Sequence, residues 1–187
     1  MKKLVYLFVL LFLISSFSFV KAQDQDAMKK WMDYMTPGEQ QKQLAKMSGD
    51  WTYTSKFWMA PGQDPTVSNG TAKFETLLDG RYMKCTVKGN MMGMPFEGMS
   101  ITGFDNAAKL FQSSWIDNMG TGIMHMTGTA DAKGVITLKG GMMDPVSGKM
   151  LDEKQVMWAD GDNKFIMEMY QMENGTERKV MEVVYTR

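Results

Sequence analysis

The chain has 187 residues with 21 basic and 21 acidic side chains, so its formal net charge is zero. This balance excludes the basic footprint expected of a nucleic-acid-binding protein, and a single cysteine, Cys85, excludes an internal disulfide. The length is that of one ordinary domain with a sizeable core. We expect Cys85 to be a small buried hydrophobic residue, because it stands in an apolar strand pattern.

The first 22 residues have the features of a secretory signal peptide. Two lysines precede an apolar run from Leu4 to Val20, and short side chains occupy the −3 and −1 positions before Gln23. The run is short for a membrane span, although an uncleaved anchor is the alternative. We therefore expect an exported protein, periplasmic or secreted, that begins at Gln23 and has no membrane contact after signal removal. Eighteen basic and 21 acidic residues would remain, a net charge of −3.

Residues 23–48 are the expected N-terminal helical segment. Thr36 can cap a second helix, with Pro37 at its first position and Glu39 completing a capping box. Ser48-Gly49 ends the apolar pattern. The sequence therefore predicts two short helices joined at Thr36. The first has one apolar face, formed by Met28, Trp31, Met32 and Met35.

From Gly49 onward the apolar residues alternate with the period of two that is typical of β-strands. Residues 49–187 contain ten such segments, separated by turns rich in Asp, Asn, Gly and Pro. Short connections imply antiparallel pairing of neighbours, and a twisted sheet of this size tends to close. We expect an all-β fold, a single antiparallel up-and-down β-barrel of about ten strands, with the helical segment at one mouth. Its interior would be wide enough for a small molecule. The expected strands are residues 50–60, 66–79, 81–90, 96–105, 109–117, 121–131, 134–141, 149–160, 164–173 and 177–186.

Several sequence blocks past the first helix carry a family resemblance. They are LAKMSGDW (44–51), FWMAPG (57–62), DGRY (79–82), MMGMPFEGMSI (91–101), GFDN (103–106), SWIDNMGTG (114–122), DP (144–145) and MEVVYTR (181–187). Together they resemble the bacterial domain-of-unknown-function 1579 family. The resemblance implies a relative of the lipocalin and calycin barrels with no established activity. It also implies that Trp51 closes the floor of the barrel.

Methionine is unusually frequent, with 22 residues in the chain. Thioethers suit Cu(I), so an exported Met-rich protein suggests soft-metal binding. The best cluster is Met91, Met92 and Met94 in one apolar turn, with Met99 as a further candidate. The triplet Met124-His125-Met126 cannot chelate as a unit, because a strand points its histidine away from both methionines. Methionine also serves as an adaptable core filler, and we expect the turn to cap or line the barrel mouth. Sacrificial oxidation is the remaining alternative.

The sequence contains no recognisable catalytic motif. A nucleophile elbow, a zinc-protease helix, paired CxxC ligands and a phosphate loop are all absent. His125 is the only histidine, and a haem ligand there rests on analogy with related barrels alone. An enzyme would have to use interior carboxylates. This hypothesis predicts an inward Glu or Asp with a raised pKa. The carboxylates considered are Glu97, Asp117, Glu168 and Glu182.

The leading hypothesis is a barrel that binds a small apolar or amphipathic molecule in its interior without chemistry of its own. Tyr185 and Arg187 share a face of the last strand and can hold a ligand carboxylate together, unless Arg187 is a frayed end in water. The alternative is a non-catalytic structural or interaction module with a filled core. No catalytic residue, metal ligand or cofactor is assigned. The candidate lining residues are Trp58, Arg81, Met83, Met91, Met92, Met94, Phe96, Trp115, His125, Tyr170, Tyr185 and Arg187.

Overall fold

The computed structural model describes residues 24–173 and 175–187. The predicted signal peptide, residues 1–22, lies outside this part. The chain divides into two compact units, of which the first ends at Thr36 and the second comprises Pro37–Arg187. Within the described residues, no helix is both long and apolar enough to span a membrane.

The first unit contains a helix over residues 24–35, as the periodicity predicts. Its polar side carries an ion pair of 2.5 Å between Lys29 and Asp33, one helical turn apart. The Thr36 hydroxyl donates to the Met32 carbonyl oxygen at 2.6 Å and so satisfies an acceptor in the last turn. The residues predicted to form its apolar face are exposed: Met28, Trp31, Met32 and Met35.

The second helix, α2 (Glu39–Ala45), has its N-cap at Gly38, two residues later than the sequence predicts. Thr36 does not cap it, because the Thr36 hydroxyl bonds to the preceding helix. Instead, the Gly38 N–H donates to Gln41 Oε1 at 2.8 Å. Gln41 Nε2 also donates to the Phe104 carbonyl oxygen of the barrel at 2.9 Å, so this side chain joins α2 to the sheet.

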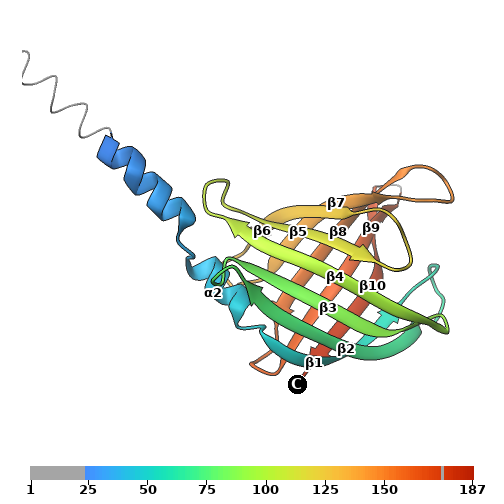
Figure 1. Ribbon diagram of the computed structural model, residues 1–187. Helices are drawn as coiled ribbons and strands as arrows, with labels where there is room; N and C mark the ends of the chain where they lie inside the picture. The colour runs from blue at the N-terminus through green and yellow to red at the C-terminus, as the bar shows by residue number, and fades with distance from the viewer. Residues whose placement is uncertain (1–23, 174) are drawn as a thin grey trace, which may run out of the picture. The chain divides into compact units, whose positions relative to one another are not determined.

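In the described part of the second unit, ten strands follow α2, as predicted. Each strand pairs antiparallel with its neighbours in sequence, and β10 pairs with β1, so the sheet closes into a barrel (Figure 1). Closure leaves no free sheet edge. The strands are β1 (Gly49–Phe57), β2 (Thr66–Leu77), β3 (Tyr82–Met91), β4 (Met94–Asp105), β5 (Leu110–Asp117), β6 (Met124–Ala130), β7 (Ile136–Met143), β8 (Met150–Ala159), β9 (Lys164–Glu173) and β10 (Thr176–Thr186).

The methionine-rich turn is tighter than the sequence suggests. Pairing of β3 with β4 continues to Met91 and Met94, which leaves only Met92 and Gly93 in the turn. Their φ angles are 53° and 82°. Two-residue hairpins of this kind need a positive φ at both central positions, so glycine at the second position is favourable. Met91 and Met94 are therefore strand residues, not turn residues.

One end of the barrel is sealed where α2 lies against it (Figure 1). Trp51 is buried there, and its Nε1 donates to the Met47 carbonyl oxygen at 2.8 Å. The rings of Phe165 and Tyr185 stack with centroids 4.2 Å apart. We call this the closed end, and its buried side chains are Leu44, Trp51, Phe74, Met83, Phe111, Ile136, Leu138, Phe165 and Tyr185.

Candidate functional site

The opposite end of the barrel has a different lining. Most of its inward-facing side chains, identified from strand register, are small, polar, aromatic or methionine, and many of them keep partial exposure. Inward side chains that remain exposed indicate that solvent enters this end, whereas the closed end is packed. We call this region the distal interior, and its partly exposed lining is Ser55, Ser68, Phe96, Ser100, Ser113, Trp115, Met124, Gln155, Gln171 and Met181.

Glu153 of β8 lies in the distal interior with only 5% of its surface exposed. Gln171 of β9, directly opposite in the register, donates from Nε2 to Glu153 Oε1 at 3.0 Å. Glu153 Oε2 is buried without a hydrogen-bond partner. Burial raises the pKa of this carboxyl, and the bond from Gln171 opposes that rise in part. A buried polar atom without a partner is uncommon and needs an explanation.

Arg178 of β10 is the register partner of Gln171 on the side away from Glu153. Its Nη2 donates to Glu173 Oε1 at 2.6 Å, and its Nη1 donates to the Trp58 carbonyl oxygen at 3.3 Å. Its Nε is buried without a partner. Glu153, Gln171 and Arg178 therefore form a polar row across three adjacent strands, which we call the interior polar row.

Trp115 forms an aromatic wall of the distal interior. Its Nε1 donates to Asp117 Oδ2 at 2.7 Å, which fixes the orientation of the indole. The ring covers Gly98 on the neighbouring strand, where an added Cβ would lie 2.3 Å from the indole. The Phe96 ring stacks on it at a centroid distance of 6.4 Å. A glycine is therefore required at position 98, where the indole lies over the neighbouring strand.

The structure places the candidate lining residues in several different regions. Met83 and Tyr185 face inward but belong to the packed closed end. Phe96 and Trp115 line the distal interior. The hairpin methionines, Met91, Met92 and Met94, lie at the tip of the β3–β4 hairpin at the distal end.

Three other candidates lie on the outer surface. His125 is exposed, and its Nδ1 is 2.9 Å from Ser114 Oγ. Tyr170 donates its hydroxyl to Glu168 Oε2 at 2.5 Å. Trp58 follows β1, with the Lys179 ammonium 5.3 Å from its ring centroid.

Two arginines among the candidates bond to the main chain. Arg81 donates from Nη1 to the Leu78 carbonyl oxygen at 3.0 Å, in the turn before β3. Arg187 donates to the carbonyl oxygens of Ser48 and Asp162 at 2.9 and 3.0 Å. Arg187 is thus neither frayed nor paired with Tyr185, which is buried in the closed end. The suggested arginine–tyrosine carboxylate site does not form.

The register confirms the geometric argument on Met124-His125-Met126. Met126 is 2% exposed inside the barrel, whereas His125 points outward. A haem held in the interior would therefore not reach His125. Within residues 24–173 and 175–187, no three His, Cys, Asp or Glu side chains gather as metal ligands. Cys85 is 6% exposed, and burial raises the pKa of its thiol to about 12, which confirms the expected buried role.

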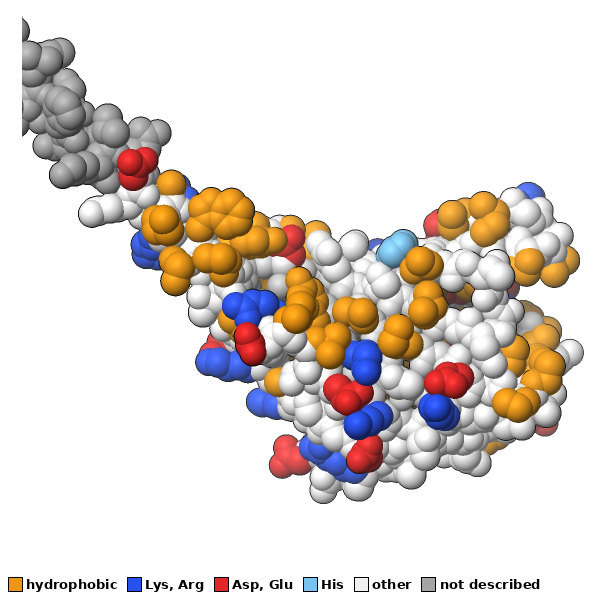
Figure 2. Space-filling view, in the orientation of Figure 1, with side chains coloured by type: hydrophobic (Ala, Val, Ile, Leu, Met, Phe, Trp, Pro, Cys, Tyr) orange, Lys and Arg blue, Asp and Glu red, His pale blue; other side chains and the backbone are white. Residues whose placement is uncertain are grey.

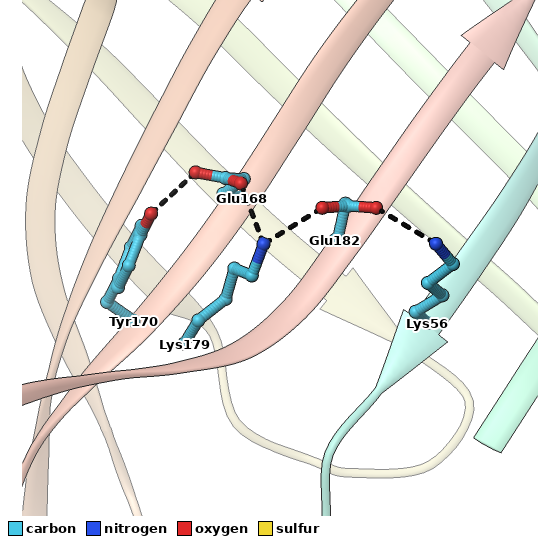
Figure 3. A network of polar contacts seen from close by, with 5 residues as sticks. All are labelled: Lys56, Glu168, Tyr170, Lys179 and Glu182. Carbon is cyan, nitrogen blue, oxygen red and sulfur yellow. Dashed lines mark hydrogen bonds and ion pairs between the residues drawn. The ribbon is translucent and has the colours of Figure 1, made fainter. Parts of the chain in front are cut away.

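A charged network crosses the outer surface where the first and last strands close the barrel (Figure 3). Lys179 of β10 bonds to Glu168 of β9 and to Glu182, each at 2.9 Å, and Lys56 of β1 lies 3.5 Å from Glu182. The hydrogen bond from Tyr170 to Glu168 raises the pKa of the Tyr170 phenol to about 12. Glu168 and Glu182 are thus used outside the barrel, and neither can act in its interior.

The outer face of β1, β2 and β3 carries a shallow groove of about 750 Å³. Its lysines are already paired: Lys73 contacts Glu75 at 3.1 Å, and Lys88 contacts Glu97 at 3.2 Å. Figure 2 shows this intermixing of basic and acidic side chains over the barrel surface. The lysines of the groove are therefore not available to a ligand, and the distal interior is the better candidate site.

The sequence reasoning missed the interior polar row. A usable signal was the turn at residues 160–163. Counting outward from it along β8 and β9 places Glu153 opposite Gln171 and Met157 opposite Met167. That count identifies cross-strand partners, but it does not say which set of partners faces inward.

These observations define the class of protein: a closed ten-stranded antiparallel barrel, sealed by a helix at one end and polar inside at the other. The chain belongs to the family described as proteins of unknown function, DUF1579, whose model matches residues 36–187. This confirms the family resemblance of the sequence blocks. A comparison with curated proteins finds no match.

Among solved structures, the chain is similar to Rv2717c from M. tuberculosis, with a TM-score of 0.60 and 14% identity over 81% of this chain and 99% of the other. A redesigned β-barrel matches with a TM-score of 0.40 and 13% identity, over 77% and 93% of the two chains. The likeness to Rv2717c supports the barrel fold alone.

Proposed function

We propose that this protein is an exported barrel that binds a small, mostly apolar or amphipathic molecule in its distal interior. The observation that carries the proposal is the contrast between the two ends. Most inward side chains are buried at the closed end, whereas the distal interior has a lining that, apart from Glu153, remains partly exposed. The kinship with lipocalin and calycin barrels implied by the family resemblance supports an interior site.

The lining suits such a ligand. Met124 and Met181 supply flexible thioether side chains that adapt to an irregular apolar shape. Trp115 and Phe96 add rigid aromatic surface, and the interior polar row can orient one end of the molecule. Ligand sites typically combine a mainly apolar wall with a few placed polar groups.

A matched pair of variants tests the proposal. Ser113→Phe adds a ring inside the barrel, whereas Ser114→Phe adds the same ring on the outer face. We expect Ser113→Phe to abolish uptake of an apolar fluorescent dye and of fatty alcohols, and Ser114→Phe to leave uptake unchanged. Tryptophan fluorescence and native mass spectrometry would measure binding, and circular dichroism would confirm the fold.

Ser113 and Thr102 share a hydrogen bond of 2.9 Å, so Ser113→Phe can lower stability. Ser55→Phe, from β1, gives a second inward block at a different place. No uptake of any probe by the unmodified protein would contradict the proposal and favour a structural module with a filled core. Equal uptake by Ser113→Phe and Ser114→Phe would place binding outside the barrel.

Glu153 also favours a second candidate, an enzyme that uses an interior carboxylate. It faces inward, is buried and has a raised pKa, as that hypothesis requires. A carboxyl whose pKa is raised by burial can act as a general acid. Chemical conversion of a bound ligand that Glu153→Gln stops, with binding retained, would establish this candidate over simple binding.

The export half of the proposal rests on residues 1–22 of the sequence. The amino-terminal sequence of the protein recovered from its own cells tests it. A chain beginning at Gln23 is expected, and a chain that retains Met1 in the cytoplasm would contradict export.

A further inference from the structure

We infer that the distal interior selects a ligand with a single primary ammonium group, which binds to Glu153, and an apolar body. The inference rests on the proposed function, because it assigns the ligand class of the same interior site. Three observations carry it: the sign of the charges that face inward, the bonds already made by those charges, and the buried carboxylate oxygen that has no partner.

The charges inside the barrel are mostly acidic. Within the described strands, every lysine lies at an outward position of the register, and Arg178 is the one basic side chain on the inner face. Three carboxylates of the described strands face inward: Asp117, Glu153 and Glu173. The inner surface thus carries an excess of negative charge, which favours a cation over an anion or a neutral molecule.

Two of the three inward carboxylates are already satisfied. Glu173 accepts a hydrogen bond from Arg178 Nη2 at 2.6 Å. Arg178 is the single inward cation, so this bond engages both groups. Asp117 accepts from Trp115 Nε1 at 2.7 Å and from the Met119 N–H at 2.9 Å. Neither group needs a ligand.

Glu153 differs from both. One of its oxygens accepts a hydrogen bond from Gln171, and the other is buried without a partner. Leaving such an oxygen unpaired is costly, and a charge-assisted N⁺–H···O⁻ bond is the strongest available complement. A primary ammonium supplies that bond on a small head group, while its alkyl body contacts the neighbouring methionine and aromatic lining.

A carboxylate ligand would have to use Arg178. The two terminal nitrogens of that guanidinium already donate to Glu173 and the Trp58 carbonyl oxygen, so the fork that recognises a carboxylate is occupied. Only Nε remains. The geometry therefore favours the amine over the acid of equal length.

The test uses three probes with one chain length and different heads: octylamine, 1-octanol and octanoate. Each is titrated into the purified protein at neutral pH, with tryptophan fluorescence and isothermal calorimetry as readouts. We expect octylamine to bind about tenfold tighter than either of the others, the scale of one hydrogen bond to a charged group. Glu153→Gln should remove that preference and leave 1-octanol binding unchanged.

Glu97→Gln is the matched control, because Glu97 is an exposed carboxylate on the outer face of β4. It should alter no affinity. Equal affinity for all three probes, or tightest binding of octanoate, would overturn the ammonium inference while interior binding stands. The ammonium inference is likewise overturned if Glu153→Gln weakens the binding of all three probes by the same factor. Failure of every probe to bind would instead overturn the proposed function itself.

Discussion

Glu153 and Gln171 face each other across β8 and β9 inside the barrel, joined by a hydrogen bond of 3.0 Å from the amide to the carboxyl. This pair holds one carboxylate oxygen in place and leaves the other buried without a partner. A buried polar pair with an unpaired oxygen does not add to stability as an apolar pair would, and it is the feature on which the proposed ammonium site rests.

The first prediction concerns the pH dependence of folding. Burial raises the pKa of Glu153 above its ordinary value of 4.5, so the folded state holds this proton more tightly than the unfolded state. The contribution of Glu153 to the free energy of unfolding is therefore greatest below about pH 4.5, and is lost as pH rises through the raised pKa. Arg178 and Glu173 are the charged groups nearest in the register, and they are paired with each other.

Glu153→Gln keeps an acceptor for Gln171 and removes the titration. We expect the variant to be more stable than the unmodified protein at neutral pH, by on the order of 1 kcal/mol. The difference should shrink toward acid pH. Urea unfolding over a range of pH checks both statements, and a parallel pH profile for the two proteins would refute them.

Tyr185 is predicted to be a core residue. It is buried, with the Phe165 ring at 4.2 Å and the Phe74 ring at 5.7 Å between centroids. Tyr185→Ala should lower the free energy of unfolding by about 3–5 kcal/mol, because the cavity left in an aromatic cluster cannot collapse. Denaturant unfolding measures the loss.

Tyr185→Phe is the control, since it keeps the ring and its packing, and it should be tolerated far better. A Tyr185→Ala protein that retains full stability and loses only ligand binding would return Tyr185 to the binding site.

Substitution of Gly70 is predicted to lower the stability of the barrel. A Cβ at this position would lie 2.2 Å from the Lys88 carbonyl oxygen and 2.6 Å from the Tyr53 ring. Gly70→Ala should therefore cost about 1–3 kcal/mol, the range for overpacking a close contact. Gly120, where no atom lies within 4 Å of the added Cβ, provides the control. Gly120→Ala should stay within about 0.5 kcal/mol, and thermal unfolding of the two variants compares them directly.

Cys85 is predicted to be inert in the folded protein. Its thiol is buried, and its pKa is raised to about 12, so almost no thiolate forms near pH 8. We expect no reaction with a thiol reagent under native conditions, and one equivalent after addition of denaturant. Rapid labelling of the native protein would mean that the barrel wall opens at β3.

The sequence alone determined the architecture. Alternation with period two and turn residues such as Gly93 and Gly161 act over a few neighbouring residues, so they can be recognised without a structure. They predict the ten strands, the pairing of neighbours and the barrel. The family blocks, matched over residues 36–187, agree with that result.

Only the tertiary structure decided which face of each mixed strand points inward. In β8 both faces carry polar and apolar residues, with Glu153 and Met157 on one and Lys154 and Trp158 on the other. A strand pattern distinguishes the two sets, but it does not say which set faces the interior of the barrel. Closure of β10 on β1 fixes the inward face of every strand at once. It turns Glu153 inward and His125 outward, because in a closed sheet neighbouring side chains must share a face.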